Sequence, residues 1–258
     1  MITAFLQGGM GNQMFQMAAA ISLAKDMGVD YKFDFDICHT PAQGNTSNKY
    51  RDNIFTNINN GPLNQSDFKK YMQSKFSYDE LPKVDNLMIR GDFQSEKYFI
   101  KYKDFIKRFL FVFSVEKMDK ADDCLDELDY DKDFTAVHVR RGDYLNKPNF
   151  HPVCTVEYYK EAMDMIGGNF IFVSDDIEWC KENFKGDNIF YSPFTNELDD
   201  LYLIMACQNQ IIANSSFSWW GAYLCQWEGN KVIAPSIWFG PQGPQDTQDI
   251  IPSDWIKI

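Results

Sequence analysis

The stretch FTAVHVRRGDYL, residues 134–145, is the clearest indication of the fold. Its first six residues are mostly apolar or β-branched and predict a buried strand that ends near Val139. Because neighbouring strand side chains point to opposite faces, Arg140 and Arg141 cannot both lie on one solvated face. Guanidinium is a planar fork of donors suited to phosphate, and open α/β sheets bind ligands beyond the carboxyl ends of their strands. The stretch therefore predicts an anion clamp at a strand tip, with structural salt bridges to Asp143 as the alternative use of the arginines.

Strands and helices alternate on both sides of this stretch, which is the pattern of a parallel sheet. Downstream we expect helices at 155–166, 177–183, 197–207 and 218–225, and strands at 169–173, 188–191, 210–213 and 231–234. Upstream we expect strands at 2–6 and 29–35 around a helix from about 12 to 27, helices at 68–76 and 96–113, and a surface helix at 117–128. The chain is thus expected to be α/β, with Rossmann-like units at 1–130 and 131–258.

Bulk composition narrows the functional class. The chain has 258 residues, of which 45% are hydrophobic and 24% charged, as in ordinary globular proteins. Its formal net charge of -12 would repel a polyanion, so we expect no nucleic-acid partner. A small anionic ligand could still bind where arginines gather.

Two further polar segments lie between an expected strand and an expected helix. Near the N-terminus is GGMGNQ, Gly8 to Gln13, whose glycines let the backbone approach a ligand and whose helix start favours negative charge. Its spacing departs from the GxGxxG fingerprint of dinucleotide sites. Near the C-terminus is NSSFS, Asn214 to Ser218, which could cradle a phosphate or could simply cap the helix through Ser216 or Ser218.

These segments together resemble glycosyltransferase family 11, the α-1,2-fucosyltransferases of bacteria and animals. The resemblance runs from the glycine loop through HVRRGD to NSSFSWWGAYL. It includes, in the family's order, GDFQSEKYF (91–99), VCTVEYYKEAM (153–163), FVSDDIEWCKENF (172–184) and DDLYLIMACQNQII (199–212). It covers most of the chain and is weakest between His39 and Leu87, where we expect the loops that select the acceptor.

The resemblance implies a GT-B architecture in which two Rossmann-like units face a cleft, with residues 1–130 on the acceptor side and 131–258 holding the donor. It implies an inverting, metal-independent galactoside α-1,2-fucosyltransferase. Such an enzyme moves L-fucose from GDP-fucose to the 2-hydroxyl of a terminal galactose on an oligosaccharide or surface glycan, and it needs no other cofactor. The open alternatives are a GDP-sugar transferase with another donor or linkage, and a non-catalytic nucleotide- or glycan-binding protein.

The residues expected to bind the donor lie in four segments. Arg140 would stabilise the charge that develops on the β-phosphate, with Arg141 as its support. Asp175 and Asp176 suit ribose hydroxyls or the guanine edge, although either could simply cap the next helix. His138 shares a strand face with Arg140 and is expected to be a hydrogen-bonded supporting imidazole rather than a base. The full expected set is Gly11, Asn12, Gln13, His138, Arg140, Arg141, Ser174, Asp175, Asp176, Asn214, Ser215, Ser216, Phe217 and Ser218.

Carboxylates raise the questions of a general base and of a metal. Inversion requires proton removal from the acceptor hydroxyl, and Asp143 is the candidate catalytic base. Its rival role is to hold an arginine, most simply Arg141, and Asp92 and Glu96 are weaker candidates for the base. The triplet Asp34-Phe35-Asp36 is similar to the DxD motif through which other glycosyltransferases bind a divalent cation. Because the arginine pair can neutralise the diphosphate, we expect no metal and interpret the triplet as two carboxylates at a strand end.

Cysteines and the N-terminus bear on the cellular setting. The six cysteines lack metal-site spacing and lie mainly in apolar segments, so we expect reduced, buried thiols. Met1 to Ala24 lacks the basic region of a signal peptide, and no run of about 18 apolar residues predicts a membrane span. Animal members of the resembled family carry a membrane anchor. We therefore expect a bacterial-type cytoplasmic enzyme that associates with the membrane peripherally, if it does so at all.

Overall fold

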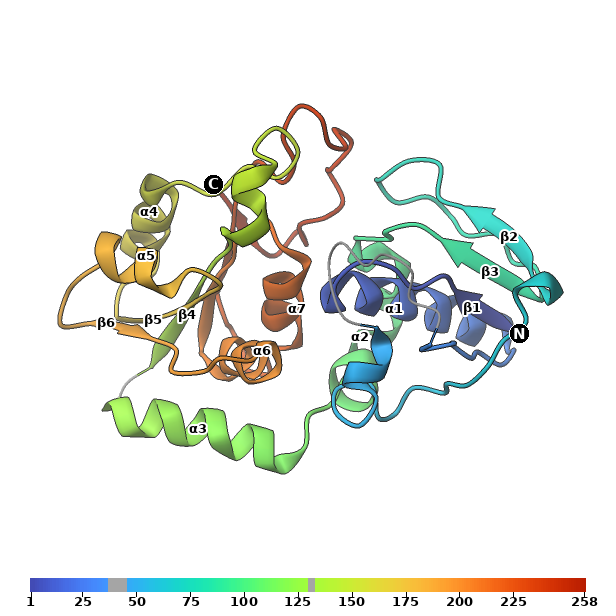
Figure 1. Cartoon of the computed structure of the whole chain (residues 1–258), viewed down its shortest axis with the longest axis horizontal. Helices are drawn as coiled ribbons and strands as arrows, with labels where there is room; N and C mark the ends of the chain where they lie inside the picture. The colour runs from blue at the N-terminus through green and yellow to red at the C-terminus, as the bar shows by residue number, and fades with distance from the viewer. Residues whose placement is uncertain (37–45, 130–132) are drawn as a thin grey trace. The chain divides into compact units, whose positions relative to one another are not determined.

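The structure, a computed structural model, describes residues 1–36, 46–129 and 133–258, which form two compact units (Figure 1). Unit 1 comprises Met1–Val112 and Asp246–Pro252, and unit 2 comprises Phe113–Gln245 and Ser253–Ile258. Each unit is built on its own parallel β-sheet, so the α/β class is confirmed. Cys38 and His39 lie outside the described residues.

The boundary between the units differs from the expected one near residue 130. Helix α3 (Val115–Asp129) belongs to unit 2, because Ala121 packs in the same buried cluster as Leu203. Late in the chain, Asp246–Pro252 belongs to unit 1, and the carboxylate of its first residue accepts a hydrogen bond from the backbone N–H of Ser77 at 2.9 Å. A single division of the sequence cannot describe this exchange.

Unit 1 contains a three-stranded sheet in the order β1-β3-β2. Its strands are β1 (Ile2–Ala4), β2 (Lys69–Met72) and β3 (Leu87–Arg90). Helix α1 (Met10–Met27) is buried on nearly all sides, because Ala, Met, Phe and Ile occupy its whole circumference. It ends as expected at Gly28, which adopts the left-handed conformation with φ of 65°.

Three expectations for unit 1 are wrong. Residues 68–76 contain strand β2 instead of a helix, because parallel pairing with β3 overrides the local helix propensity of lysine and methionine. Residues 29–35 make isolated bridges at Tyr31 and Phe33 instead of a continuous strand. Residues 96–113 form short 3-10 turns, the three-residue α2 (Lys103–Phe105) and a π-helical turn, since Phe99 (φ -144°, ψ 6°) breaks the helical run.

Unit 2 contains a six-stranded sheet in the order β6-β5-β4-β7-β8-β9. Its strands are β4 (Phe134–Val139), β5 (Asn169–Ser174), β6 (Ile189–Tyr191), β7 (Asn209–Ile211), β8 (Val232–Ala234) and β9 (Ile256–Lys257). Its helices besides α3 are α4 (Val156–Ile166), α5 (Ile177–Asn183), α6 (Glu197–Ala206) and α7 (Ser216–Leu224). All but β9 lie close to their predicted positions.

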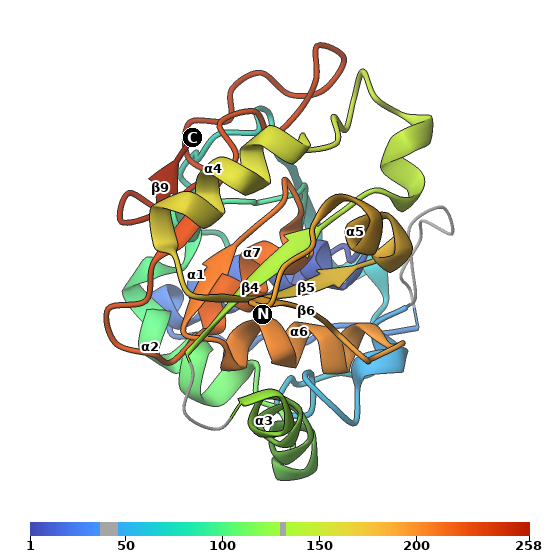
Figure 2. The same ribbon diagram turned by 90° about the vertical axis from the view of Figure 1, so that its left-hand side faces the viewer.

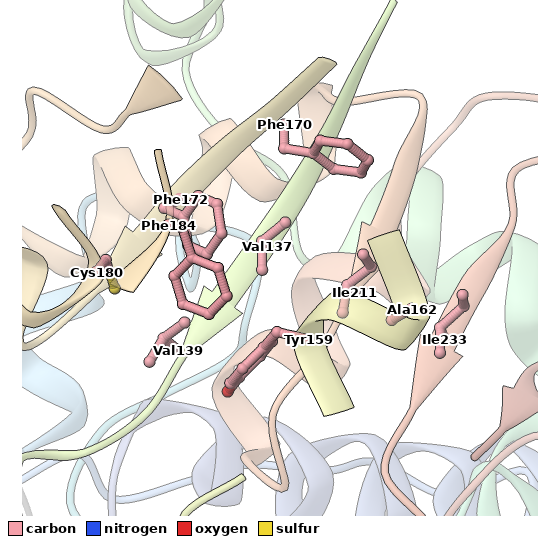
Figure 3. Packing of buried hydrophobic residues seen from close by; sticks show 10 residues of the cluster. All are labelled: Val137, Val139, Tyr159, Ala162, Phe170, Phe172, Cys180, Phe184, Ile211 and Ile233. Atoms are coloured by element: carbon pink, nitrogen blue, oxygen red, sulfur yellow. The ribbon is translucent and has the colours of Figure 1, made fainter. Parts of the chain in front are cut away.

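Successive residues of β4 serve opposite faces of the sheet. Val137 and Val139 pack with Tyr159 of α4 in the cluster drawn in Figure 3. Phe134 and Ala136 belong to a second cluster with side chains of α3 and α6. Figure 2 shows α4 and α5 on one side of this sheet and α6 and α3 on the other. A parallel strand covered on both faces has no exposed polar side, which explains why its sequence is mostly apolar or β-branched.

The strand order of unit 2 reverses direction beside β4. From β4 the chain builds β5 and β6 on one side, and it then returns to build β7, β8 and β9 on the other side. Open α/β sheets bind their ligands at such a switch point, outside the carboxyl ends of the strands. The arginine pair follows β4 and the NSSFS turn follows β7, so the topology brings these two motifs to one edge of the sheet.

Candidate active site

Arg140 holds two carboxylates with one guanidinium group. Its Nη2 donates to Oδ1 of Asp143 at 2.5 Å, and its Nη1 lies 3.0 Å from Oδ2 of Asp175. Its guanidinium carbon is also 5.3 Å from the ring centroid of Tyr144. The expected pair between Asp143 and Arg141 is wrong, because the short turn after β4 brings Asp143 back to the first arginine instead.

Arg141 is held more tightly against the protein. Its Nε donates to Oδ2 of Asp176 at 2.9 Å, and its guanidinium carbon lies 4.1 Å from the ring centroid of Trp179. The side chain of Arg141 is 17% exposed, against 35% for Arg140. The two adjacent arginines thus point to different partners, and Arg140 is the one that a ligand can reach.

The charges of this cluster do not add up to a basic site. Two arginines face three aspartates, at positions 143, 175 and 176, so their formal charges sum to -1. Although burial opposes the charged guanidinium, the carboxylates of Asp175 and Asp143 raise the pKa of Arg140 above its usual value. The carboxylates hold the fork of Arg140 in place, and a diphosphate would compete with them for it.

The turn after β5 supplies the matching carboxylates. Oγ of Ser174 accepts a hydrogen bond from the backbone N–H of Asp176 at 2.9 Å, and Asp176 caps α5 by accepting from the N–H of Trp179 at 3.3 Å. Asp175 accepts from the backbone N–H of Arg141 at 2.9 Å. A side chain at Gly142 would place its Cβ 2.4 Å from Oδ2 of Asp175, so this approach requires glycine. Capping by Asp176 is confirmed, and nucleotide contact by Asp175 or Asp176 stays a prediction.

Helix α7 begins within the NSSFS turn without a side-chain cap. Its N-cap residue is Ser215, whose side chain makes no capping hydrogen bond. Ser218 instead donates its hydroxyl to the carbonyl of Ser215 at 3.4 Å. The alternative in which Ser216 or Ser218 merely caps the helix is therefore wrong. A helix start that carries no side-chain cap remains suited to bind an anion.

Asn214 anchors three loops around this helix start. Its Nδ2 donates to the carbonyls of Pro152 and Trp238, each at 2.9 Å, and its Oδ1 lies 3.6 Å from Sγ of Cys154. Its own carbonyl accepts from the hydroxyl of Tyr144 at 3.1 Å. The side chain is 2% exposed. Asn214 therefore positions the turn in this structure, and donor contact through its amide stays a prediction.

His138 lies in β4 behind Arg140 and is 4% exposed. Its ring centroid is 5.3 Å from that of Phe217 on α7, which fixes the start of α7 beside β4. Burial, together with the charge of Arg140, lowers the pKa of His138 to about 3, so the ring is neutral and a very weak base. Among the described residues its Nδ1 has no hydrogen-bond partner, which corrects the expectation of a fully hydrogen-bonded imidazole.

The polar side chains of the glycine loop make hydrogen bonds within unit 1. Gln13 is fully buried, donates to the carbonyl of Gly8 at 2.8 Å and accepts from Ser47 at 2.5 Å, so it does not face a ligand as expected. Gly8 adopts φ of 77°, and a Cβ there would lie 2.5 Å from Nδ2 of Asn12. Oδ1 of Asn12 accepts from Gln94 at 3.0 Å, which ties this loop to the loop after β3. Gly11 is buried within α1.

The Asp34-Phe35-Asp36 triplet forms a turn. Asp34 accepts from the backbone N–H of Asp36 at 3.1 Å and from that of Leu63 at 3.0 Å, and Asp36 accepts from the side chain of Asn48. Both carboxylates thus have structural partners within unit 1. Among the residues that the structure describes, no group of three His, Cys, Asp or Glu side chains is arranged as a metal site.

Sequence reasoning missed two aromatic residues of the site. Tyr144 lies beside Arg140 and binds the carbonyl of Asn214, so it links the arginine motif to the turn before α7. The ring of Trp179 packs against the guanidinium group of Arg141. The available signals were the position of Tyr144 within the HVRRGDYL motif and the proximity of Trp179 to an expected helix start.

Two observations concern the cellular setting. In the described parts of the chain, no helix combines the length and apolarity that a membrane crossing requires. The cysteines at 124, 154, 180, 207 and 225 are free thiols.

Comparison with known proteins places this geometry in a family. Glycosyl transferase family 11 matches residues 1–258. The chain is 29% identical to the alpha-1,2-colitosyltransferase of Escherichia coli, over 100% of this chain and 98% of that protein. It is 30% identical to the O-antigen biosynthesis glycosyltransferase WbnK of Escherichia coli, over 98% of this chain and 99% of that protein. A 36% identity to galactoside alpha-(1,2)-fucosyltransferase 1 of Leontopithecus chrysomelas covers 37% of this chain and 30% of that protein.

Solved structures share the fold at low sequence identity. The fucosyltransferase NodZ from Bradyrhizobium matches with a TM-score of 0.51 and 13% identity, covering 85% of this chain and 90% of that one. A FUT1 variant of Arabidopsis thaliana in complex with GDP matches with a TM-score of 0.54 and 10% identity, covering 90% of this chain and 70% of that one. With the family match over its whole length, the chain belongs to glycosyltransferase family 11 and has a GT-B-type fold.

Proposed function

We propose that this protein transfers L-fucose from GDP-fucose to the 2-hydroxyl of a terminal galactose, with inversion and without a metal ion. The observation that carries the proposal is the fork of Arg140 at the switch point of the second sheet, beside the start of α7. Both features are suited to a diphosphate. Family membership supports a transfer of this kind.

The chemistry requires stabilisation of a leaving group. As the bond between the sugar C1 and the β-phosphate oxygen breaks, positive charge develops on the sugar ring and negative charge on the phosphate. Arg140 would meet that negative charge with two parallel N–H donors, and the first-turn amides of α7 would add their dipole. Arg141, Asn214 and His138 would act as positioning residues, since each of them packs against the protein around Arg140 or α7.

Donor binding would exchange the partners of Arg140. The diphosphate would take the place of Asp143, Asp175 or both on the guanidinium, because the fork cannot serve all of them at once. In this mechanism Arg140 would supply the positive charge at the diphosphate, and no metal ion would be required. The released carboxylates would be free to accept from ribose or base donors of the nucleotide.

The two units would divide the substrates. We assign the donor to unit 2, because the arginine fork and the α7 start both belong to it. We assign the acceptor to unit 1, whose glycine loop and loop after β3 are joined at the carboxyl edge of the first sheet.

A second candidate differs only in the sugar. A relative that matches the whole chain is named an alpha-1,2-colitosyltransferase, and colitose is L-fucose without its 3-hydroxyl. Sugars that differ by one hydroxyl can be discriminated strongly only where the site hydrogen-bonds that hydroxyl. The colitosyl donor is therefore the competitor against which fucose specificity should be measured.

Donor competition tests the proposal. GDP-fucose, GDP-colitose and GDP-mannose are each incubated with the protein and a galactose-ended acceptor in the presence of EDTA, and kcat/KM is measured for GDP release. We expect GDP-fucose to give the highest kcat/KM. A higher value with GDP-colitose would select the second candidate, and tight GDP binding without release from any donor would indicate a binding protein.

A further inference from the structure

Asp92 lies just beyond the carboxyl edge of the first sheet, as Arg140 does on the second. It follows β3, the central strand of the order β1-β3-β2, with one residue between them. The neighbouring strand β1 leads at the same edge into the glycine loop. Gln94 of the Asp92 loop donates to Asn12 of the glycine loop at 3.0 Å, so the two loops form one structure.

The loop that carries Asp92 is held rigidly. Oε1 of Gln73 accepts hydrogen bonds from the backbone N–H groups of Asp92 and Phe93, at 2.8 and 3.1 Å. Phe93 is fully buried with φ of 51°, a left-handed conformation that is strained for a bulky residue. Strain of this kind persists only where the surroundings impose it, and it concentrates at functional sites.

Among the parts of the chain that the structure describes, no partner commits the carboxylate of Asp92 to a structural role. Within the described residues, Asp92 makes no side-chain hydrogen bond and no ion pair, and partial burial alone raises its pKa. Two cations close to Asp92 in the sequence have other partners: the guanidinium of Arg90 lies 4.3 Å from the ring centroid of Phe5, and Lys97 pairs with Asp249. The other carboxyl group of this segment belongs to Glu96, which is buried at 9% exposure.

This environment differs from that of Asp143. The carboxylate of Asp143 is engaged in an ion pair with the guanidinium of Arg140. An unpaired, partly buried carboxylate is a stronger base and is suited to remove a proton near neutral pH. A carboxyl group at a sheet edge whose pKa is raised by burial is a candidate functional group.

We propose that Asp92 is the general base that activates the acceptor hydroxyl, an assignment that rests on the proposed function. One carboxylate oxygen of Asp92 takes the proton of the galactose 2-hydroxyl. The hydroxyl oxygen uses the electron pair of its broken O–H bond to form a bond to C1 of fucose. At the same time the bond from C1 to the β-phosphate oxygen breaks, and GDP leaves with the electrons of that bond. The proton passes from Asp92 to water after the product leaves.

The test compares Asp92→Asn with Asp30→Asn. The control removes an exposed carboxylate at the opposite edge of the same sheet, since the carbonyl of Asp30 binds the N–H of Ile2 at the start of β1. We expect Asp92→Asn to lower kcat for transfer about 100-fold or more and to abolish the acidic limb of its pH profile. Calorimetric GDP affinity and the melting temperature should stay at or above wild-type values, because the amide avoids burying a charge.

A second variant separates chemistry from structure. Asp92→Ala should regain turnover in added formate, because a small carboxylate can enter the space of the lost side chain, whereas Asp30→Ala should not respond. Wild-type kcat in Asp92→Asn, or an unchanged pH profile without formate rescue of Asp92→Ala, would overturn the assignment and leave the proposed function intact. A wild-type protein that transfers fucose to no galactoside would overturn the proposed function itself.

Discussion

Replacing Arg140 by lysine keeps the positive charge at the end of β4 and removes the fork. The guanidinium of Arg140 reaches Asp143 with one nitrogen and Asp175 with the other, at 2.5 and 3.0 Å. An ammonium group is a point charge on a flexible chain and cannot reproduce two parallel donors. The variant therefore tests geometry with net charge held constant.

The size of the expected loss in kcat follows from the role of Arg140 in stabilising the leaving phosphate. Loss of one preorganised donor to a developing anion lowers kcat by roughly a hundredfold to a thousandfold, or about 3–4 kcal/mol. The effect on folding should be small, because the side chain is 35% exposed and ion pairs of that exposure contribute at most about 1 kcal/mol. Arg140→Lys should thus lose turnover while its free energy of unfolding stays near the wild-type value.

The assay measures single-turnover transfer from GDP-fucose, GDP affinity by calorimetry and urea unfolding, with Arg108→Lys as an exposed control in unit 1. Arg141→Lys should show the reverse pattern, with a mild loss of rate and a larger loss of stability. This substitution removes the guanidinium contact with Trp179 and the hydrogen bond from Nε to Asp176. Wild-type turnover in folded Arg140→Lys would refute the assignment, and a larger rate loss in Arg141→Lys would show that the two roles are reversed.

Three further variants probe the surroundings of the site. Burial first, and then the charge of Asp199, raises the pKa of Asp200 to about 6, so wild-type stability is lost as pH rises through 6. In urea unfolding at pH 7.5, Asp200→Asn should raise the free energy of unfolding by up to roughly 3 kcal/mol. This gain should vanish near pH 4. Asn214→Ala leaves two carbonyls unsatisfied and should cost about 3 kcal/mol in urea unfolding, and a loss under 1 kcal/mol would contradict its anchoring role. Asp143→Asn removes a competitor for Arg140 and should lower the Kd for GDP about threefold at low salt, whereas a raised Kd would mean that Asp143 mainly orients the arginine.

Unit 2 was predictable because burial on both faces of its sheet dictates the sequence. The apolar residues of β4 and β5 fix two interior strands, and Asp176 caps α5 as one of the two alternatives that the sequence offered. Unit 1 was less predictable. Strand β2 is mostly exposed and exists through pairing with β3, a long-range contact that no local pattern in Lys69–Met72 reports.

The site was predictable in its motifs and not in its partners. The alternation of strand side chains correctly separates Arg140 from Arg141, and the topology explains why the arginines and the NSSFS turn share an edge. Partner choice depends on turn geometry, which brings Asp143 to Arg140 through a 3-10 turn. The burial of Gln13 and Asn214 depends on packing between loops far apart in the sequence.

The linkage of the product tests the proposed transfer most directly. The protein is incubated with GDP-fucose, EDTA and a panel of galactose-ended oligosaccharides, and the new glycosidic bond is assigned by NMR. We predict an α-linked fucose on the 2-hydroxyl of galactose, formed with inversion from the β-linked donor while the chelator is present. A product with another linkage or a retained configuration would contradict the proposed transfer. Product formation only after manganese or magnesium is restored would contradict its metal-free mechanism.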